Sequence, residues 1–398
     1  MIHKEKVLEL ANQLNDKIQE VHHYLHQHPE LAFEEANTAR YICQFLDEQG
    51  ISYTKGVAKT GVIGLIKGKN PNVKVLALRA DMDALEIEEQ NKIPYKSLNT
   101  GVMHACGHDV HMASLLGTLS ILHRLRDEFE GTVKFIFQPS EEKYPGGASV
   151  MIKEGVLKNP EVNQIFGQHV FPELEVGKVG FRKGKYMAST DEIYLKVKGK
   201  GGHGGIPHHV VDTVLMASHI IVALQQISSR MANPTMPTVL SFGKFIANGQ
   251  TNVIPDVVEI EGTVRTFDEA WRKKIHAEIQ KIAKGVAQSM GGDCEVTIAH
   301  GYPFVYNEEN MTNRAIKAAK ELLGEAQVVD LEMRMTAEDF SYFSQEIPGC
   351  FYRLGTANIR KGIVSNLHTS TFDVDAESLK IGMSLMAWLA IKELEYKL

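Results

Sequence analysis

The chain has 398 residues, of which 43% are hydrophobic and 23% are charged, and this length and balance predict a folded protein of two domains rather than a disordered chain. A formal net charge of -6 and the lack of any block of Lys and Arg argue against nucleic acid as the main partner. No apolar run reaches the ~18 residues that a membrane span needs, and the N-terminal segment lacks the apolar stretch of a signal peptide. We therefore expect no membrane partner, a cytoplasmic location and four reduced cysteines.

Two helices are predicted at the start of the chain, over residues 4–28 and 35–49, because apolar residues recur there at helical spacing. His22 and His26 would share one face of the first helix, which is a two-ligand pattern for a metal. No acidic residue of an HExxH motif accompanies them, however. We therefore expect them to be solvated or capping histidines.

Three predicted strands end in side chains with acid–base or metal-binding chemistry. The strands cover residues 73–80, 132–138 and 164–167, and the side chains that follow them are Asp81, Asp83, Glu141, Glu142 and His169. Sites in open α/β sheets form at the carboxyl ends of the strands, so we expect these side chains to gather at one edge.

Residues 103–111 hold one thiol and three imidazoles, and they lead into an apolar helix predicted over residues 110–125. Ionised thiols and neutral imidazoles bind transition metals strongly. In an extended segment Cys106 and His108 point to the same side, so they can bind one metal ion or share two. A lone Cys-x-His pair is more often a buried thiol beside a surface histidine, but the carboxylates and His169 favour a metal site.

The adjacent Glu141 and Glu142 can divide the work of such a site. One carboxylate would bind a metal ion, and the other would take a proton from a water that the metal activates. No Ser or Cys nucleophile is then required, and the sequence has no Gly-x-Ser-x-Gly elbow. The candidate ligands match the needs of two metal ions with open positions, and they are Cys106, His108, Glu142, His169 and His368.

The pattern changes after about residue 185. A strand, helix, strand, strand, helix and strand are predicted over residues 191–198, 208–229, 238–246, 257–267, 268–290 and 294–300. This βαββαβ order is that of a ferredoxin-like α+β unit. The chain is therefore expected to be an α/β protein with a mixed-sheet catalytic domain, residues 1–185 and 302–398, interrupted by an inserted domain at residues 186–301.

The inserted domain also carries a G-x-G-x-x-G pattern between residues 199 and 204, after a strand and before a helix. That context suits dinucleotide binding, but the acidic residue expected about 20 positions later is missing. We expect these glycines to let the backbone approach a ligand or a partner subunit instead, with His203 presented on the turn.

Several motifs together resemble the aminoacylase/carboxypeptidase family of two-metal hydrolases, and most closely its amidohydrolase branch, which includes hippurate hydrolases and plant auxin-conjugate hydrolases. The motifs are LHQHPEL from residue 25, RADMDAL from 79, MHACGHD from 103, QPSEE from 138, GGHGGIPH from 201 and LHT from 367.

The resemblance implies that Cys106, His108, Glu142, His169 and His368 bind two divalent metal ions and that Glu141 is the general base and acid. The ions would be Zn or Mn, with Co or Ni as alternatives. Asp83 would orient a ligand histidine by accepting its other N–H. The inserted domain would be a lid that makes a homodimer or higher oligomer, and His203 would enter the partner's active site. Asn252 and Arg265 would bind the substrate's carboxylate.

The activity implied is metal-dependent hydrolysis of the amide bond of N-acyl amino acids. A dipeptidase or carboxypeptidase of the same family is an alternative. A non-catalytic metal-binding dimer is less compatible with the sequence, because a structural metal needs no free carboxylate such as Glu141.

Overall fold

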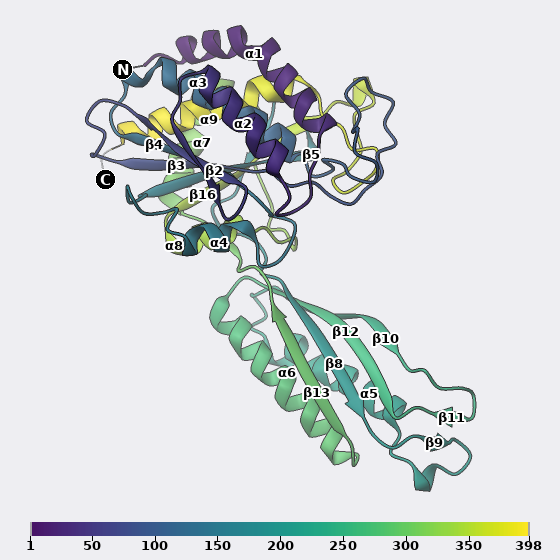
Figure 1. The fold of residues 1–398 in the computed structure, drawn as a ribbon. Coiled ribbons are helices and arrows are strands. Elements are labelled where there is room, and N and C mark those ends of the chain that lie inside the picture. Colours follow the sequence, from purple (N-terminus) through teal and green to yellow (C-terminus); the bar gives the residue numbers. More distant parts are fainter. Residues whose placement is uncertain (1, 397–398) are drawn as a thin grey trace. The chain divides into compact units, whose positions relative to one another are not determined.

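The computed structural model describes residues 2–396, and the chain divides into two compact units (Figure 1). Unit 1 comprises the chain up to Tyr186, Tyr306–Glu332 and the chain from Asp339 onward. Unit 2 comprises Met187–Val305 together with the short segment Met333–Glu338.

Unit 1 contains an eight-stranded mixed sheet in the order β1-β2-β4-β3-β5-β16-β6-β15. Its strands are β1 (Tyr53–Val57), β2 (Gly61–Lys67), β3 (Val75–Asp81), β4 (Thr132–Gln138), β5 (Gln164–Glu175), β6 (Val179–Phe181), β15 (Val328–Asp330) and β16 (Gly349–Ala357). The central neighbours β4, β3, β5 and β16 run parallel. Every residue of β3 and β4 is buried, as expected for parallel strands that are covered on both faces.

Helices cover both faces of this sheet (Figure 1). They are α1 (Lys4–Gln27), α2 (Ala36–Glu48), α3 (His108–Arg124), α4 (Gly147–Lys153), α7 (Glu309–Leu323), α8 (Phe340–Glu346) and α9 (Glu377–Glu395). The helix α3 is buried from His108 to Leu122, because it packs against the sheet, α1 and α9 at once. One apolar core therefore holds the start of α3 beside the ends of the central strands.

Unit 2 has the element order β8 (Asp191–Lys198), α5 (Thr213–Leu224), β10 (Thr238–Ile246), β12 (Val257–Thr266), α6 (Glu269–Ser289) and β13 (Asp293–His300). Its antiparallel sheet has the order β10-β12-β8-β13. Burial alternates along β8, so one face of the sheet packs on α5 and α6 while the other is exposed. Unit 2 also holds a short ribbon of β9 (Gly202–His203) with β11 (Val253–Ile254). A second ribbon, β7 (Gly184–Met187) with β14 (Val305–Asn307), has most of its residues in unit 1.

The helix predicted over residues 208–229 is shorter than expected. It begins at Thr213, because the Asp212 carboxylate caps the amides of Val214 and Leu215. It ends at Leu224, after which Ile227–Met231 form a single wider turn.

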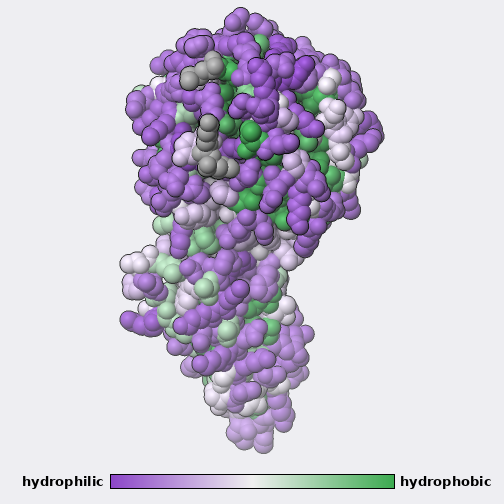
Figure 2. All heavy atoms as spheres, turned by 90° about the vertical axis from the view of Figure 1, so that its left-hand side faces the viewer, coloured by the Kyte–Doolittle hydropathy of each residue, from purple (hydrophilic) through white to green (hydrophobic). Residues whose placement is uncertain are grey.

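Hydrophilic residues predominate on the face drawn in Figure 2, and the hydrophobic residues there form smaller patches. Most large apolar side chains lie in the two cores instead. Among residues 2–396, no helix is both long and apolar enough to cross a membrane. All four cysteines lie in the described part of the chain, buried and without a disulfide bond.

Candidate metal centre

The carboxyl ends of β4, β3 and β5 lie side by side, because β3 pairs in parallel with both of its neighbours. This arrangement brings the loop of Glu141 and Glu142, the end of β3 at Asp81 and the β5 residue His169 to one edge of the sheet. The start of α3 adds Cys106 and His108, and both are buried. The structure thus gathers the side chains that were predicted from three separate strands.

Two groups of potential donor atoms share the Cys106 thiol. Cys106, His108 and His169 form one group, and Cys106, Glu142 and His368 form the other, with the donor atoms of each group within 4.8 Å of one another. Cys106 Sγ lies 3.4 Å from His169 Nε2, and Glu142 Oε1 lies 3.3 Å from His368 Nε2. Two overlapping sets with a common thiol are what a pair of adjacent ions would require.

Two candidate ligand histidines, His108 and His169, have their rings oriented by hydrogen bonds from Nδ1. His108 donates from Nδ1 to the backbone carbonyl of Asp83 at 2.8 Å, and His169 does the same to Val170 at 2.8 Å. In the neutral form of each ring the lone pair therefore lies on Nε2. His108 Nε2 has no hydrogen-bond partner among the described residues. Burial opposes protonation of His108, but the charge of Asp81 and the contact with Asp83 outweigh it and raise the pKa to about 10, so a dication would displace a proton from this ring. Burial, reinforced by the charge of Arg353, holds the pKa of His169 well below its usual range, so this ring is neutral.

The electrostatic environment of Cys106 also suits cations. Burial, followed by the charges of Glu142 and Glu141, raises the pKa of the thiol well above its usual range. Several anionic groups converge on one buried position, where a dication would stabilise both the carboxylates and a thiolate. The donor set therefore fits two divalent ions.

Asp83 makes more contacts than the one predicted. Its carboxylate was expected to accept the N–H of a ligand histidine, but the His108 Nδ1 hydrogen bond goes to the Asp83 backbone carbonyl, and the carboxylate Oδ1 lies 3.4 Å from that nitrogen. The carboxylate also accepts the backbone N–H of Glu141 at 2.8 Å and of Glu142 at 2.9 Å. The predicted role of Asp83 toward a ligand histidine stays a prediction, since its carboxylate remains close to the His108 ring nitrogen. Asp83 holds the two glutamates as well as His108.

Two residues of the site have left-handed backbone conformations that are uncommon outside glycine. Ser140, just before Glu141, has φ 52°, and His368 has φ 59°. Such conformations persist where surrounding contacts impose them, and the amide of His368 donates to the Ala105 carbonyl at 2.8 Å.

A buried polar network around Arg79 on β3 adjoins the site, and the sequence did not reveal it. Arg79 pairs with Asp81, donates to Asp339 at 2.8 Å and to Gln138 at 2.9 Å. Burial alone would raise the pKa of Asp81, but Arg79 and His108 outweigh it and hold that pKa well below its usual range. Asp339 comes from the start of α8, far along the chain, so only the tertiary fold shows this contact.

His111 braces the same region rather than binding metal. Its Nδ1 lies 2.5 Å from Asp81 Oδ1, and its Nε2 accepts the backbone N–H of Val170 at 2.9 Å. Both ring nitrogens are thus engaged. His111 connects the end of β3 to the residue that follows His169.

His22 and His26 are buried, so the expectation that they are solvated or capping histidines was wrong. His22 Nε2 lies 3.0 Å and His26 Nδ1 2.7 Å from the same Asp109 oxygen. Burial opposes protonation of His26, but hydrogen bonds with Asp109 and Glu89 outweigh it and raise its pKa to about 10. This ion pair fastens α1 to the residue next to His108.

The other candidate residues belong to unit 2. His203 on β9 pairs with Val253 on β11, and the Gly204 amide donates to the Asn252 carbonyl at 2.8 Å, so His203 and Asn252 share one exposed ribbon. Arg265 on β12 is half-buried and lines a groove on the exposed face of the unit-2 sheet. Its guanidinium donates to the Thr263 hydroxyl and to the Val264 carbonyl.

The glycine-rich turn approaches the chain's own backbone. A Cβ on Gly201 would lie 2.4 Å from the Ile254 carbonyl oxygen. The following helix is already capped by Asp212, which leaves its first amides paired. The turn therefore lacks the open helix N-terminus that a dinucleotide would use.

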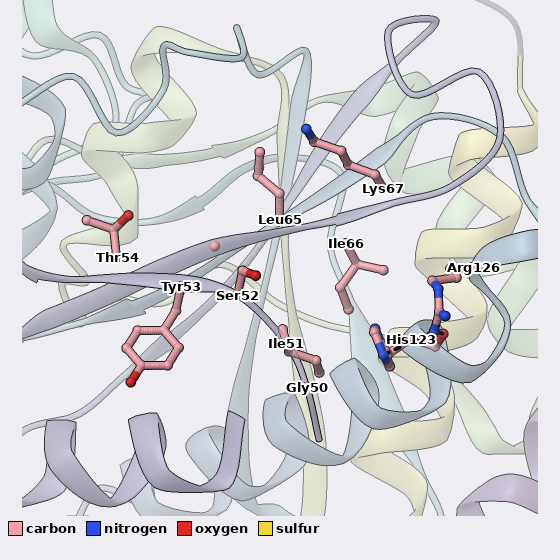
Figure 3. Close-up of a pocket in the computed structure, with 11 residues that line it drawn as sticks. Gly50, Ile51, Ser52, Tyr53, Thr54, Leu65, Ile66, Lys67, His123 and Arg126 are labelled. Atoms are coloured by element: carbon pink, nitrogen blue, oxygen red, sulfur yellow. Dashed lines mark hydrogen bonds between the residues drawn. The ribbon is translucent and has the colours of Figure 1, made fainter. Parts of the chain in front are cut away.

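A pocket on unit 1 beside the edge strand β1 and its neighbour β2 is separate from these donors (Figure 3). His123 and Arg126 lie together at one side of it, and Arg126 donates to the His123 ring at 3.1 Å. None of its lining residues belongs to the two donor groups.

Comparisons with known proteins agree with this site. The sequence profile of Peptidase family M20/M25/M40 matches residues 77–392. The chain is 40% identical to an N-acetylcysteine deacetylase of Bacillus subtilis, over 93% of this chain and 95% of that protein. It is 38% identical to thermostable carboxypeptidase 2 of Saccharolobus solfataricus, over 98% of each. A crystal structure from Bacillus subtilis, described as a dinuclear metal-binding peptidase of the M20 family, superimposes with a TM-score of 0.84 and 37% identity over 96% of this chain and 99% of that one. The family resemblance seen in the motifs is confirmed, and the chain belongs to peptidase family M20/M25/M40.

Proposed function

We propose that this protein is a metal-dependent amidohydrolase that cleaves the amide bond of N-acyl amino acids. The observation that carries the proposal is the pair of donor groups joined at Cys106, with the carboxylate of Glu141 next to them in the chain. A relative with 40% identity is named for deacetylation of an N-acyl amino acid, which supports the same bond as the target.

In this proposal Cys106, His108, Glu142, His169 and His368 hold two divalent ions. The ions would lower the pKa of water and polarise the acyl carbonyl. Zn or Mn is proposed because a thiolate favours softer ions while imidazole and carboxylate accept either.

Glu141 is proposed as the general base and acid. It takes a proton from the attacking water and later returns it to the nitrogen of the leaving amino acid. The Glu141 carboxylate Oε1 lies 3.3 Å from the backbone nitrogen of Asp339, and the backbone amide of Glu141 donates to the Asp83 carboxylate. These two contacts hold the Glu141 side chain beside the donors.

Unit 2 is proposed to be a ferredoxin-like dimerisation domain. Its βαββαβ order and its sheet order β10-β12-β8-β13 support this description. The outer side of α5 exposes Leu215 at 50% and Val222 at 72%, and β10 is an edge strand, so both offer surface to a second copy. His203 of the partner subunit would then stabilise the oxyanion, while Asn252 and Arg265 would bind the substrate carboxylate. A cytoplasmic location is part of the same proposal.

A carboxypeptidase or dipeptidase activity is the second candidate, because a relative with 38% identity is named a carboxypeptidase. The test is a substrate panel of N-acetyl, N-benzoyl and longer N-acyl amino acids, with dipeptides and N-blocked dipeptides beside them. Each is assayed with protein stripped of metal and with the same protein reloaded with Zn²⁺ or Mn²⁺. Preferential release of amino acid from N-acyl amino acids by the loaded protein supports the proposal, and preferential cleavage of dipeptides supports the second candidate.

A further inference from the structure

We propose that Glu35 is a positioning residue for the loop that carries Glu141 and Glu142. This inference rests on the proposed function, since it concerns the general base and one of the metal ligands. Glu35 precedes α2 and is about one hundred residues from that loop in sequence, and its side chain is fully buried, at 0% exposure.

Three successive backbone amides of the loop donate to two buried carboxylates. The Ser140 amide donates to Glu35 Oε1 at 2.8 Å, and the next two amides donate to the two oxygens of Asp83. Burial raises the pKa of Glu35, and the hydrogen bonds from Thr60 and from the Ser140 amide oppose that shift. The loop is thus fixed by carboxylates at consecutive positions, and Glu35 supplies the first of them.

Glu35 is itself held in one orientation. Its Oε1 also accepts the Phe33 amide at 3.0 Å, and its Oε2 accepts the Thr60 hydroxyl at 2.6 Å. Burying a carboxylate costs free energy unless hydrogen-bond donors replace its lost water, and buried Glu residues are rare without such partners. Of these three donors, Ser140 belongs to the loop of the two glutamates, and Thr60 belongs to the turn between β1 and β2.

The hydrogen bond from Ser140 to Glu35 is made at a residue with an uncommon backbone conformation. Ser140 has φ 52°, a conformation that a non-glycine residue adopts only when its surroundings enforce it. Its carbonyl also accepts the Gly147 amide at 2.7 Å, so both peptide groups of Ser140 are fixed. Releasing the Ser140 amide would let the following carboxylates move away from the donor groups.

The test compares Glu35→Ala with Glu35→Gln. Alanine removes the acceptor, whereas glutamine keeps one oxygen for the Ser140 amide and offers an NH₂ group to the Thr60 hydroxyl. Partners that orient a metal site cost roughly 10–100-fold in affinity or activity when removed. We expect Glu35→Ala to lower kcat and Zn²⁺ affinity by about 10-fold each while KM changes by less than about threefold, and Glu35→Gln to restore both to within about threefold of the wild type. Zn²⁺ affinity is measured by competition with a chelating dye.

Glu308→Ala is the matched control. Glu308 also accepts two backbone amides, those of Asn310 and Met311, but it caps α7 and touches neither the loop nor the donors. It should lower thermal stability and leave kcat and Zn²⁺ affinity unchanged. The proposal is overturned if Glu35→Ala keeps wild-type kcat and Zn²⁺ affinity, if Glu308→Ala reduces them equally, or if Glu35→Gln is as impaired as Glu35→Ala. A wild-type protein that hydrolyses no amide would refute the proposed function, but the Zn²⁺ comparison would still decide the role of Glu35.

Discussion

Replacing Asp83 by Asn tests whether a carboxylate is needed to hold the two glutamates. Each oxygen of Asp83 accepts one backbone amide, from Glu141 at 2.8 Å and from Glu142 at 2.9 Å. Asparagine has only one accepting oxygen, so its NH₂ group would face one of these two N–H donors. The substitution changes hardly any volume, which keeps the effect on packing small.

The expected magnitude follows from these two contacts. A hydrogen bond to a charged group contributes about 1.5–3 kcal/mol, and a buried donor left without an acceptor costs about 1–3 kcal/mol. Displacement of the loop relieves part of this cost, and the displacement moves Glu141 and Glu142. We therefore expect kcat for an N-acyl amino acid to fall by roughly 10–100-fold, with weaker retention of metal on dialysis.

The assay is steady-state hydrolysis with metal content measured on the same samples. Asp212→Asn is the matched control, because Asp212 also accepts two amides, but both go to the same oxygen, Oδ1, which asparagine retains. That control should behave like the wild type. Wild-type kcat and metal content in Asp83→Asn would refute the idea that the Asp83 carboxylate positions the loop.

Two further predictions concern stability. Gly107 has φ 78°, and a Cβ there would lie 2.5 Å from Val170 Cγ2, so Gly107→Ala should destabilise the protein by about 2–4 kcal/mol in urea unfolding. The control is Gly101→Ala, because Gly101 has φ 77° but no atom within 4 Å of the added Cβ, so this variant should lose only the backbone contribution of about 1–2 kcal/mol. Equal losses of stability in the two variants would contradict a clash at Gly107. Burial alone would raise the pKa of Asp191, but hydrogen bonds from Arg272 and His276 outweigh it and hold that pKa below 3.8. The stability it contributes is therefore present above pH 3.8 and lost as the pH falls through the lower folded value; thermal unfolding between pH 3 and 6 should show the gap between wild type and Asp191→Asn closing toward the acid end, and a gap independent of pH would contradict this.

The elements most accurately predicted from the sequence were apolar strands with clear polar limits. The strands at residues 132–138, 191–198 and 238–246 have in the structure the same bounds that their patterns predicted. The ends of such strands are defined by the polar residues next to them in the sequence. The long helix of unit 2 was misjudged because Asp212, a strong cap, defines its start more firmly than the apolar pattern does.

The donor residues could be predicted because Cys, His and Glu reveal their chemistry by type, and because parallel strands bring their ends together. The residues that support these donors could not be predicted from the sequence. Glu35 and His26 look like ordinary polar residues of helices, and charged residues are usually exposed. Their burial depends on contacts with Ser140 and Asp109, which lie far away in sequence.

The central claim is that this chain hydrolyses N-acyl amino acids with two metal ions and Glu141 as the base. The most direct measurement is kcat of metal-loaded Glu141→Gln beside the metal-loaded wild type, with the metal content of both determined. The account predicts about two metal ions per chain in each protein and a loss of at least 100-fold in kcat for the variant, since general acid–base catalysis contributes about 10²–10⁴-fold. A variant that keeps near-normal kcat with full metal content would contradict it.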